Sequence, residues 1–195
     1  MTILETDRLV LRRCEESDAE ALFAYLEAPT ASCFFSLKLE NLTAARDEAL
    51  KRSDSDESIA VCLKETGQLI GDLFAHPDPK WPEDSTALSD TVSVGWNFNP
   101  VFGRRGYASE AAQALYDELF MHRGTRRIYA YVEGYNTSSR RLCEKLGMRQ
   151  EGLFLEYVTF QNDSTGNPLC ENTMQYAILR REWEAIAATK MAAFT

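Results

Sequence analysis

The stretch from Thr91 to Phe120 constrains the fold of this chain more than any other, because it predicts a strand, a loop and a helix in direct succession. Apolar residues first alternate with smaller or polar ones, the period of a half-buried strand, at Val92, Val94, Trp96 and Phe98. They then recur at spacings of four, three and four, the period of one helical face, at Ala108, Ala112, Leu115 and Leu119. The pattern therefore places a helix N-terminus close after the end of a strand.

The loop between them, residues 101–107, contains two glycines and two arginines. The first N–H groups of a helix have no partner within the helix and lie at the positive end of its dipole. A glycine-containing loop that enters a helix is therefore a binding site for phosphate groups. Two other phosphate-binding patterns are excluded, because the loop lacks G-x-G-x-x-G spacing and no G-K-[S/T] follows.

A second stretch, residues 136–148, predicts a helix with both of its ends defined. Asn136 is a good N-cap residue, Leu142 and Leu146 share one face, and Gly147 suits the left-handed position after the last turn. Serine is common in the first turn of a helix, so helix architecture alone accounts for Ser139.

Both stretches resemble motifs of one family. Residues 106–111, G-Y-A-S-E-A, are similar to motif A of the GNAT acetyltransferases, usually written Q/R-x-x-G-x-G/A, in the form typical of the RimJ and RimL ribosomal-protein N-acetyltransferases. Gly106 and Ala108 occupy the two small positions. Gly103 stands at the Q/R position, and Arg104 stands where the next residue is commonly glycine. Arg104 or Arg105 could supply the charge that the motif's missing side chain would carry.

Residues 136–148 match motif B of the same branch, N-x-x-S followed by E-K-L-G-M, about 30 residues after motif A. The resemblance implies that Asn136 contacts the pantetheine arm of acetyl-CoA and that the Ser139 hydroxyl lies beside the thioester sulfur. The main chain of Trp96 and Phe98 is implied to pair with the same arm. The cofactor-binding residues that the resemblance implies are Trp96, Phe98, Arg104, Arg105, Gly106, Tyr107, Ala108, Ser109 and Asn136.

The implied fold is α+β and spans residues 1–195 as a single domain. It has a central, mostly antiparallel sheet of about seven strands with helices on both faces, and its fourth and fifth strands splay apart to form the cofactor cleft. The elements expected beside the two motif stretches are a strand at 9–12, a helix opened by the capping box Ser17 to Glu20, an irregular segment at 31–39, a helix at 43–52, a hairpin of 59–63 and 69–74, a loop at 76–90, a strand at 127–132, and tail strands near 153–160 and 173–179.

Charge and composition limit the partners. A net charge of −9 argues against nucleic acid and mildly favours a cationic acceptor. The sequence has no apolar run of membrane-spanning length, no signal peptide, and five scattered cysteines without C-x-x-C spacing, so we expect a cytoplasmic protein with reduced thiols and no membrane partner. His76 and His122 are too isolated to indicate a metal site. We expect a monomer or a homodimer.

The implied reaction is direct N-acetyl transfer from acetyl-CoA to an amine, either a protein N-terminal α-amine or a small molecule. Ser139 is the candidate proton donor to the leaving thiolate, while Cys143 is better explained as a core thiol. A strand N–H near Phe98 or Asn99 would hold the oxyanion. The general base stays open among Asp72, Glu133, His76 and water. Trp81 would either cover the acceptor or anchor its loop.

Two other functions stay open beside the enzyme. One is a non-catalytic acyl-CoA-binding or sensing domain of the same fold, which keeps motif A but has no working base. The other is an interaction module without affinity for coenzyme A.

Overall fold

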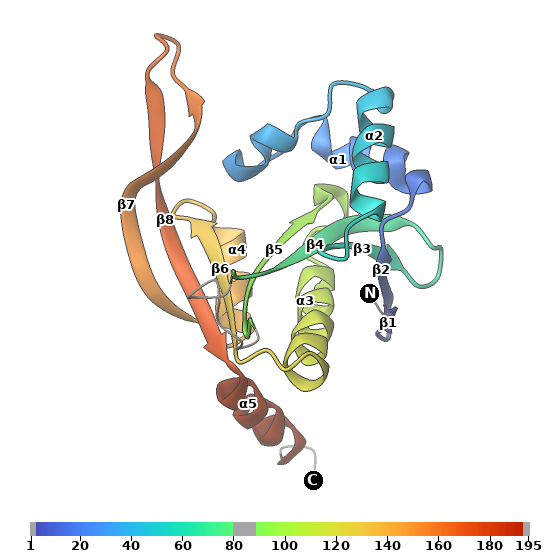
Figure 1. Ribbon diagram of the computed structural model, residues 1–195, viewed down its shortest axis with the longest axis vertical. Helices are drawn as coiled ribbons and strands as arrows, with labels where there is room; N and C mark the ends of the chain where they lie inside the picture. Colours follow the sequence, from blue (N-terminus) through green and yellow to red (C-terminus); the bar gives the residue numbers. More distant parts are fainter. Residues whose placement is uncertain (1–2, 80–88, 193–195) are drawn as a thin grey trace.

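One mixed sheet of eight strands organises the computed structural model, which describes residues 3–79 and 89–192 (Figure 1). The strand order is β1-β2-β3-β4-β5-β6-β8-β7, and only β5 and β6 pair in parallel. The strands are β1 (Leu4–Glu5), β2 (Leu9–Arg13), β3 (Ser58–Leu63), β4 (Leu69–Pro77), β5 (Thr91–Phe98), β6 (Arg127–Glu133), β7 (Arg149–Asn162) and β8 (Pro168–Leu179).

Helices cover both faces of the sheet. They are α1 (Ala19–Leu26), α2 (Leu42–Ser53), α3 (Tyr107–Asp117), α4 (Thr137–Lys145) and α5 (Arg180–Ala192), with short turns η1 (Glu16–Asp18), η2 (Ser32–Leu37), η3 (Pro100–Phe102) and η4 (Glu118–His122). Alternate residues of β3 enter different cores: Ile59 and Val61 join the core with α3 and α4, while Ala60 and Cys62 join the core with α1 and α2. The period-two pattern of the strands thus builds two apolar layers.

The structure confirms the predicted α+β fold with helices on both faces, and it corrects several details. The sheet has eight strands, because the short β1 pairs with β2. The helix α5 was not expected from the sequence, although Trp183 within it is buried and its indole N–H donates to Asp117 Oδ1 at 2.7 Å. Of the predicted loop at 76–90, residues 76 and 77 belong to β4, which continues to Pro77, and residues 80–88 lie outside the described residues.

The predicted capping box from Ser17 to Glu20 is wrong. The capping box joins Glu15 and Asp18 instead, and α1 begins at Ala19. The reason is the Asp18 carboxylate, which accepts hydrogen bonds from both terminal nitrogens of Arg12 at 2.7 and 2.8 Å and from the Glu15 N–H. These bonds turn Asp18 inward, so a 3₁₀ turn precedes the helix.

The sheet opens between β5 and β6, which correspond to the fourth and fifth strands of the prediction. They pair only from Thr91 to Ser93, so the remaining half of β5 has no partner on that side. On its other side β5 stays paired with β4 from Val92 to Phe98. The predicted splay is therefore present.

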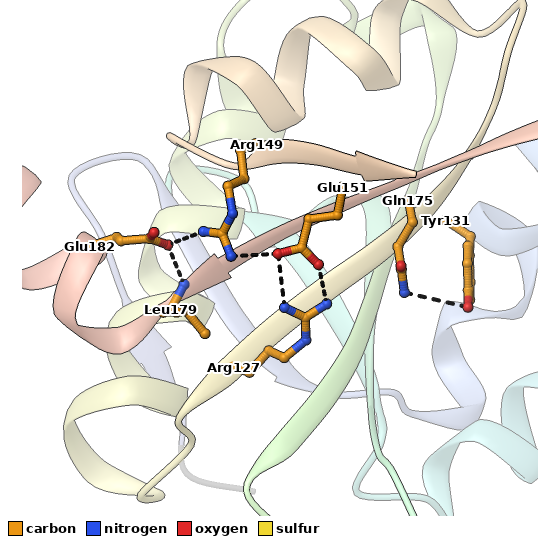
Figure 2. Close-up of polar contacts among 7 residues, drawn as sticks. All are labelled: Arg127, Tyr131, Arg149, Glu151, Gln175, Leu179 and Glu182. Carbon is orange, nitrogen blue, oxygen red and sulfur yellow. Dashed lines mark hydrogen bonds and ion pairs between the residues drawn. The ribbon is translucent and has the colours of Figure 1, made fainter. Parts of the chain in front are cut away.

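The far edge of the sheet is the long hairpin of β7 and β8, which extends beyond the body of the molecule (Figure 1). A chain of ion pairs fixes its base, as Figure 2 shows. Glu151 on β7 accepts from Arg127 on β6 and from Arg149, and Arg149 also pairs with Glu182 of α5. Glu182 in turn accepts the Leu179 N–H at 2.8 Å, which joins the start of α5 to the same network.

Candidate active site

Two cavities lie where β5 and β6 separate. The loop cavity, about 340 Å³, is lined by residues 96–98, by the loop and first turn of α3, by one side of α4 as far as Leu142, and by Thr30, Ala31 and Phe34. The sheet cavity, about 590 Å³, is lined by η2, α2, β3, β4, β5, β6 and the start of α4. Four residues line both cavities: Phe34, Trp96, Asn136 and Ser139. The two cavities therefore meet at the splay.

The loop cavity contains the N-terminus of α3 without a side-chain cap. Gly106, the N-cap residue, has a φ of 83°, a left-handed conformation that glycine adopts without steric cost. Because no side chain caps this helix, its first N–H groups are available to an anion. Arg104 also has a left-handed φ, 62°, which explains why glycine is common at this position of motif A.

Arg8 is a basic residue that contacts the loop from outside the cavity lining, and the sequence analysis did not find it. Its guanidinium lies 4.7 Å from the ring centroid of Tyr107, donates to the Arg105 carbonyl at 3.0 Å and forms an ion pair of 2.5 Å with Glu110. Through these contacts the residue directly before β2 holds the loop in place. No local pattern could have found Arg8, because it lies almost a hundred residues before the loop.

The main chain of β5 faces the splay at alternate residues. Asn99 N–H donates to the Ile70 carbonyl at 3.0 Å, so the hydrogen-bonded pairs with β4 fall at residues 99, 97 and 95. The N–H and C=O groups of Trp96 and Phe98 consequently point toward β6, where no strand pairs with them. Asn99 is thereby excluded as an oxyanion donor, and Phe98 N–H is the group that remains.

A hydrogen-bonded chain joins the two strands across the splay. Trp96 Nε1 donates to Ser139 Oγ at 3.0 Å, and Ser139 N–H donates to the Asn136 side-chain oxygen at 3.1 Å. The side-chain nitrogen of Asn136 donates to Glu133 Oε2 at 3.2 Å. Asn136 thus caps α4, as predicted, and also orients a carboxylate of the sheet cavity.

Comparison with known proteins identifies the family of this site. Residues 8–149 match the family model for the acetyltransferase (GNAT) domain. A Bacillus subtilis protein named uncharacterized N-acetyltransferase YnaD is 30% identical over 181 residues, which are 92% of this chain and 98% of that protein. The chain belongs to the GNAT acetyltransferase family. It is an acyltransferase. The two alternatives without catalytic activity, the acyl-CoA-binding or sensing domain and the interaction module, are set aside.

Solved GNAT structures share the fold. An acetyltransferase of this family from Bacillus anthracis superposes with a TM-score of 0.78 at 29% identity, covering 93% of this chain and 100% of that one. The ribosomal-protein-S5-alanine acetyltransferase from Vibrio fischeri has a TM-score of 0.66 at 16% identity, covering 94% of this chain and 99% of that one. That lower similarity shows the fold alone, so it carries no statement about the acceptor.

Most of the predicted site residues of this GNAT acetyltransferase line the loop cavity: Trp96, Phe98, Arg104, Gly106, Tyr107, Ala108, Ser109, Asn136 and Ser139. Arg105 does not, and its guanidinium lies 6.0 Å from the Phe102 ring centroid at the exposed surface. Cys143 is fully buried in the core, as predicted, where burial raises the pKa of its thiol to about 12. Trp81 lies outside the described residues.

The three candidate bases differ sharply in their surroundings, although all line the sheet cavity. His76 is half exposed, and its Nδ1 lies 2.5 Å from Glu57 Oε2. Asp72 is 6% exposed, and its Oδ2 accepts the Tyr25 hydroxyl at 2.5 Å and lies 3.2 Å from Arg52 Nη1. Burial raises the pKa of Asp72, while Arg52 and Tyr25 oppose part of that effect.

Glu133 is the third candidate and is also 6% exposed. It stands at the end of β6 and contributes to the sheet cavity next to Asn136 and Ser139. No lysine or arginine among the described residues forms an ion pair with it. It therefore differs from Asp72, whose charge is already matched by a buried guanidinium.

A clasp of three residues, Ser32, Tyr135 and Glu171, holds η2 over both cavities. Ser32 is 2% exposed; its N–H donates to Tyr135 Oη at 2.9 Å, and its hydroxyl bonds Tyr135 Oη and Glu171 Oε2, each at 2.7 Å. The next residues, Cys33 and Phe34, line the sheet cavity. The segment predicted to be irregular is thus a short helical turn pinned to β8 and to the turn after β6.

Proposed function

We propose that this acetyltransferase transfers the acetyl group of acetyl-CoA directly to a primary amine, with acetyl-CoA in the loop cavity and the amine in the sheet cavity. One observation carries the proposal: Ser139 and Trp96 line both cavities, so both substrates reach the same hydroxyl group. GNAT acetyltransferases in general use acetyl-CoA as the donor. The acceptor is either a protein N-terminal α-amine, as in the RimJ and RimL branch, or a small amine.

The loop cavity suits the donor in two respects. The uncapped N–H groups between Arg104 and Ser109 would bind the pyrophosphate of acetyl-CoA, and Gly106 lets that anion approach the backbone closely. The unpaired main chain of Trp96 and Phe98 would bond the pantetheine arm in the place of a missing strand. The Phe98 N–H is then well placed to stabilise the oxyanion that forms when the amine attacks the thioester carbonyl.

Ser139 would protonate the sulfur of coenzyme A as the carbon–sulfur bond breaks. An indole N–H can only donate, so Trp96 occupies a lone pair of Ser139 Oγ and leaves the hydroxyl proton free. The contact therefore orients the hydroxyl as a donor. The thiol of coenzyme A has a pKa close to that of cysteine, so the thiolate is a tolerable leaving group and this proton is helpful rather than indispensable.

Glu133 would take the proton that the attacking amine loses, directly or through one water molecule. Glu133 is buried, and the Asn136 side chain, which also accepts from the Ser139 N–H, donates to its carboxylate. Asp72 is less suited, because Arg52 and Tyr25 already engage it, and His76 lies half exposed beside Glu57. Together these surroundings favour Glu133 among the three candidates.

The test measures free thiol release by wild-type protein and by Glu133→Gln over a panel of peptide N-termini, amino acids, polyamines and aminoglycosides. We expect amine-dependent release by the wild type and a loss of roughly 10²–10³-fold in kcat/KM for Glu133→Gln. Glu144→Gln is the matched control, because Glu144 is an exposed acidic residue of α4 that lines neither cavity. Wild-type activity in Glu133→Gln would exclude this residue as the base.

A further inference from the structure

The end of the sheet cavity formed by β4 and α2 contains a buried ionic pair that the transfer reaction does not use. Arg52 of α2 and Asp72 of β4 are 7% and 6% exposed, and both line the cavity. Arg52 Nε donates to Glu48 Oε1 at 2.7 Å, Nη1 lies 3.2 Å from Asp72 Oδ2, and the same Oδ2 accepts the Tyr25 hydroxyl.

Each partner keeps one polar atom available. Within the described residues, Arg52 Nη2 donates no hydrogen bond and Asp72 Oδ1 accepts none. Neither atom is among the buried side-chain atoms that lack a partner, which belong to Arg140, Thr173 and Arg180, so both reach open space. Since both residues line the sheet cavity, that space is the cavity itself.

We infer that Arg52 and Asp72 form a second subsite of the sheet cavity, which binds an amide group adjacent to the acceptor's amine. A carbonyl oxygen can accept from Arg52 Nη2, and an amide N–H can donate to Asp72 Oδ1. A buried polar pair strongly favours a ligand that satisfies both of its members, because an unpaired buried group is costly. The inference rests on the proposed function and specifies its acceptor class.

The position of the subsite fits an amide close to the amine. Asp72 lies on the same face of the sheet as Glu133, the proposed base: Asp72 is paired with Asn97, and the register of Ser93 with Tyr129 places Glu133 level with Asn97 across the splay. Neighbouring strands are roughly 5 Å apart, so two spacings, roughly 10 Å or more where the sheet opens, separate Asp72 from Glu133. An amine at Glu133 and an amide at Asp72 that one carbon separates fit a span of this order, as in an α-aminoacyl amide.

Local charge disfavours a free carboxylate at the same place. Glu48 and Asp72 place two carboxylates around one buried guanidinium, and Lys51 is exposed and reaches only Glu48, at 3.5 Å. A third carboxylate would be repelled. Apolar wall residues, including Leu37, Phe74 and Val132, favour an acceptor with an apolar side chain.

The test compares kcat/KM for L-phenylalaninamide, L-phenylalanine methyl ester and L-phenylalanine with the wild-type enzyme. The ester keeps the activated amine and the carbonyl but has no N–H donor, so it is the matched control for the amide. We expect the amide to exceed the ester at least tenfold, and the free acid to be the poorest of the three. A tetrapeptide amide that begins with phenylalanine shows whether a peptide N-terminus shares the preference of the free amide.

Asp72→Val, which removes the acceptor oxygen that an asparagine would keep, then tests whether the subsite causes the preference. We expect the amide-to-ester ratio to fall toward one in this variant, whatever its total activity, since the ratio cancels a general loss of folded enzyme. Equal turnover of amide and ester by the wild type would overturn the inference, as would a preference for the acid or for polyamines. Those results would leave acetyl transfer intact, whereas the absence of any amine-dependent thiol release would overturn the proposed function itself.

Discussion

The loop cavity and the sheet cavity meet at Ser139 but are built in different ways. Most residues of the loop cavity come from two short stretches, 96–109 and 136–142, and this cavity offers backbone N–H groups and small residues. The sheet cavity draws side chains from seven elements that are spread between Cys33 and Ser139. A site that uses backbone groups needs a local conformation, so a short motif can encode it. A site that uses side chains from distant elements depends on the whole fold.

Ser139 lines both cavities, so a substitution there distinguishes an effect on catalysis from an effect on the binding of either substrate. Ser139→Ala should lower kcat about ten- to hundredfold and leave KM for acetyl-CoA nearly unchanged, the pattern of an interaction made only in the transition state. Steady-state kinetics with both substrates varied would measure this split. Cys143→Ala is the control, because its thiol is buried in the core and lines neither cavity. A kcat within a factor of two of wild type, with chemistry rate-limiting, would remove Ser139 from the mechanism.

A change in the loop cavity should act on the donor alone. Gly106→Glu introduces bulk and a like charge where the pyrophosphate would bind, so we expect at least tenfold weaker acetyl-CoA binding in calorimetry. Gly67→Glu is a matched control, since Gly67 also has a left-handed φ, 71°, but lies in the turn between β3 and β4 with open space around it. Equal dissociation constants for Gly106→Glu and wild type would contradict the assignment of the loop cavity.

The sequence predicted the loop cavity better than it predicted the sheet cavity. The strand, loop and helix around Gly106 and the cap at Asn136 were predictable, because glycine conformations and helix caps are local properties. Arg8 and the Arg52–Asp72 pair were not, because the fold brings each to its site from a distant segment. The capping box failed for a related reason: a tertiary ion pair with Arg12 redirected Asp18.

The clasp over η2 should affect mainly the acceptor. Tyr135→Phe removes the hydroxyl that bonds the N–H and the side chain of Ser32. Loss of such bonds amounts to roughly 0.5–1.5 kcal/mol each, so KM for the amine should rise about two- to tenfold while KM for acetyl-CoA changes less. Tyr157→Phe, an exposed tyrosine of β7, is the control. A larger effect on acetyl-CoA would mean that η2 belongs chiefly to the loop cavity.

The smallest expected effect concerns backbone strain in the loop cavity. Arg104 has a left-handed φ of 62°, so Arg104→Gly should relieve steric cost and, after the entropy that glycine adds to the unfolded chain, raise stability by about 0.5 kcal/mol. Arg104→Ala keeps the strain and removes the same charge. Denaturant unfolding of both variants separates the two contributions, and equal stability of Gly and Ala at this position would argue against strain.

The most direct test of two cavities serving one transfer step is a grid of initial rates over acetyl-CoA and amine concentrations, with the acetylated amine detected by mass spectrometry. Direct transfer requires both substrates to be bound together, so the account predicts double-reciprocal lines that intersect and thiol release that depends on the amine. Parallel lines would indicate a covalent acetyl-enzyme intermediate. Parallel lines, or thiol release without any acetylated amine, would contradict the account.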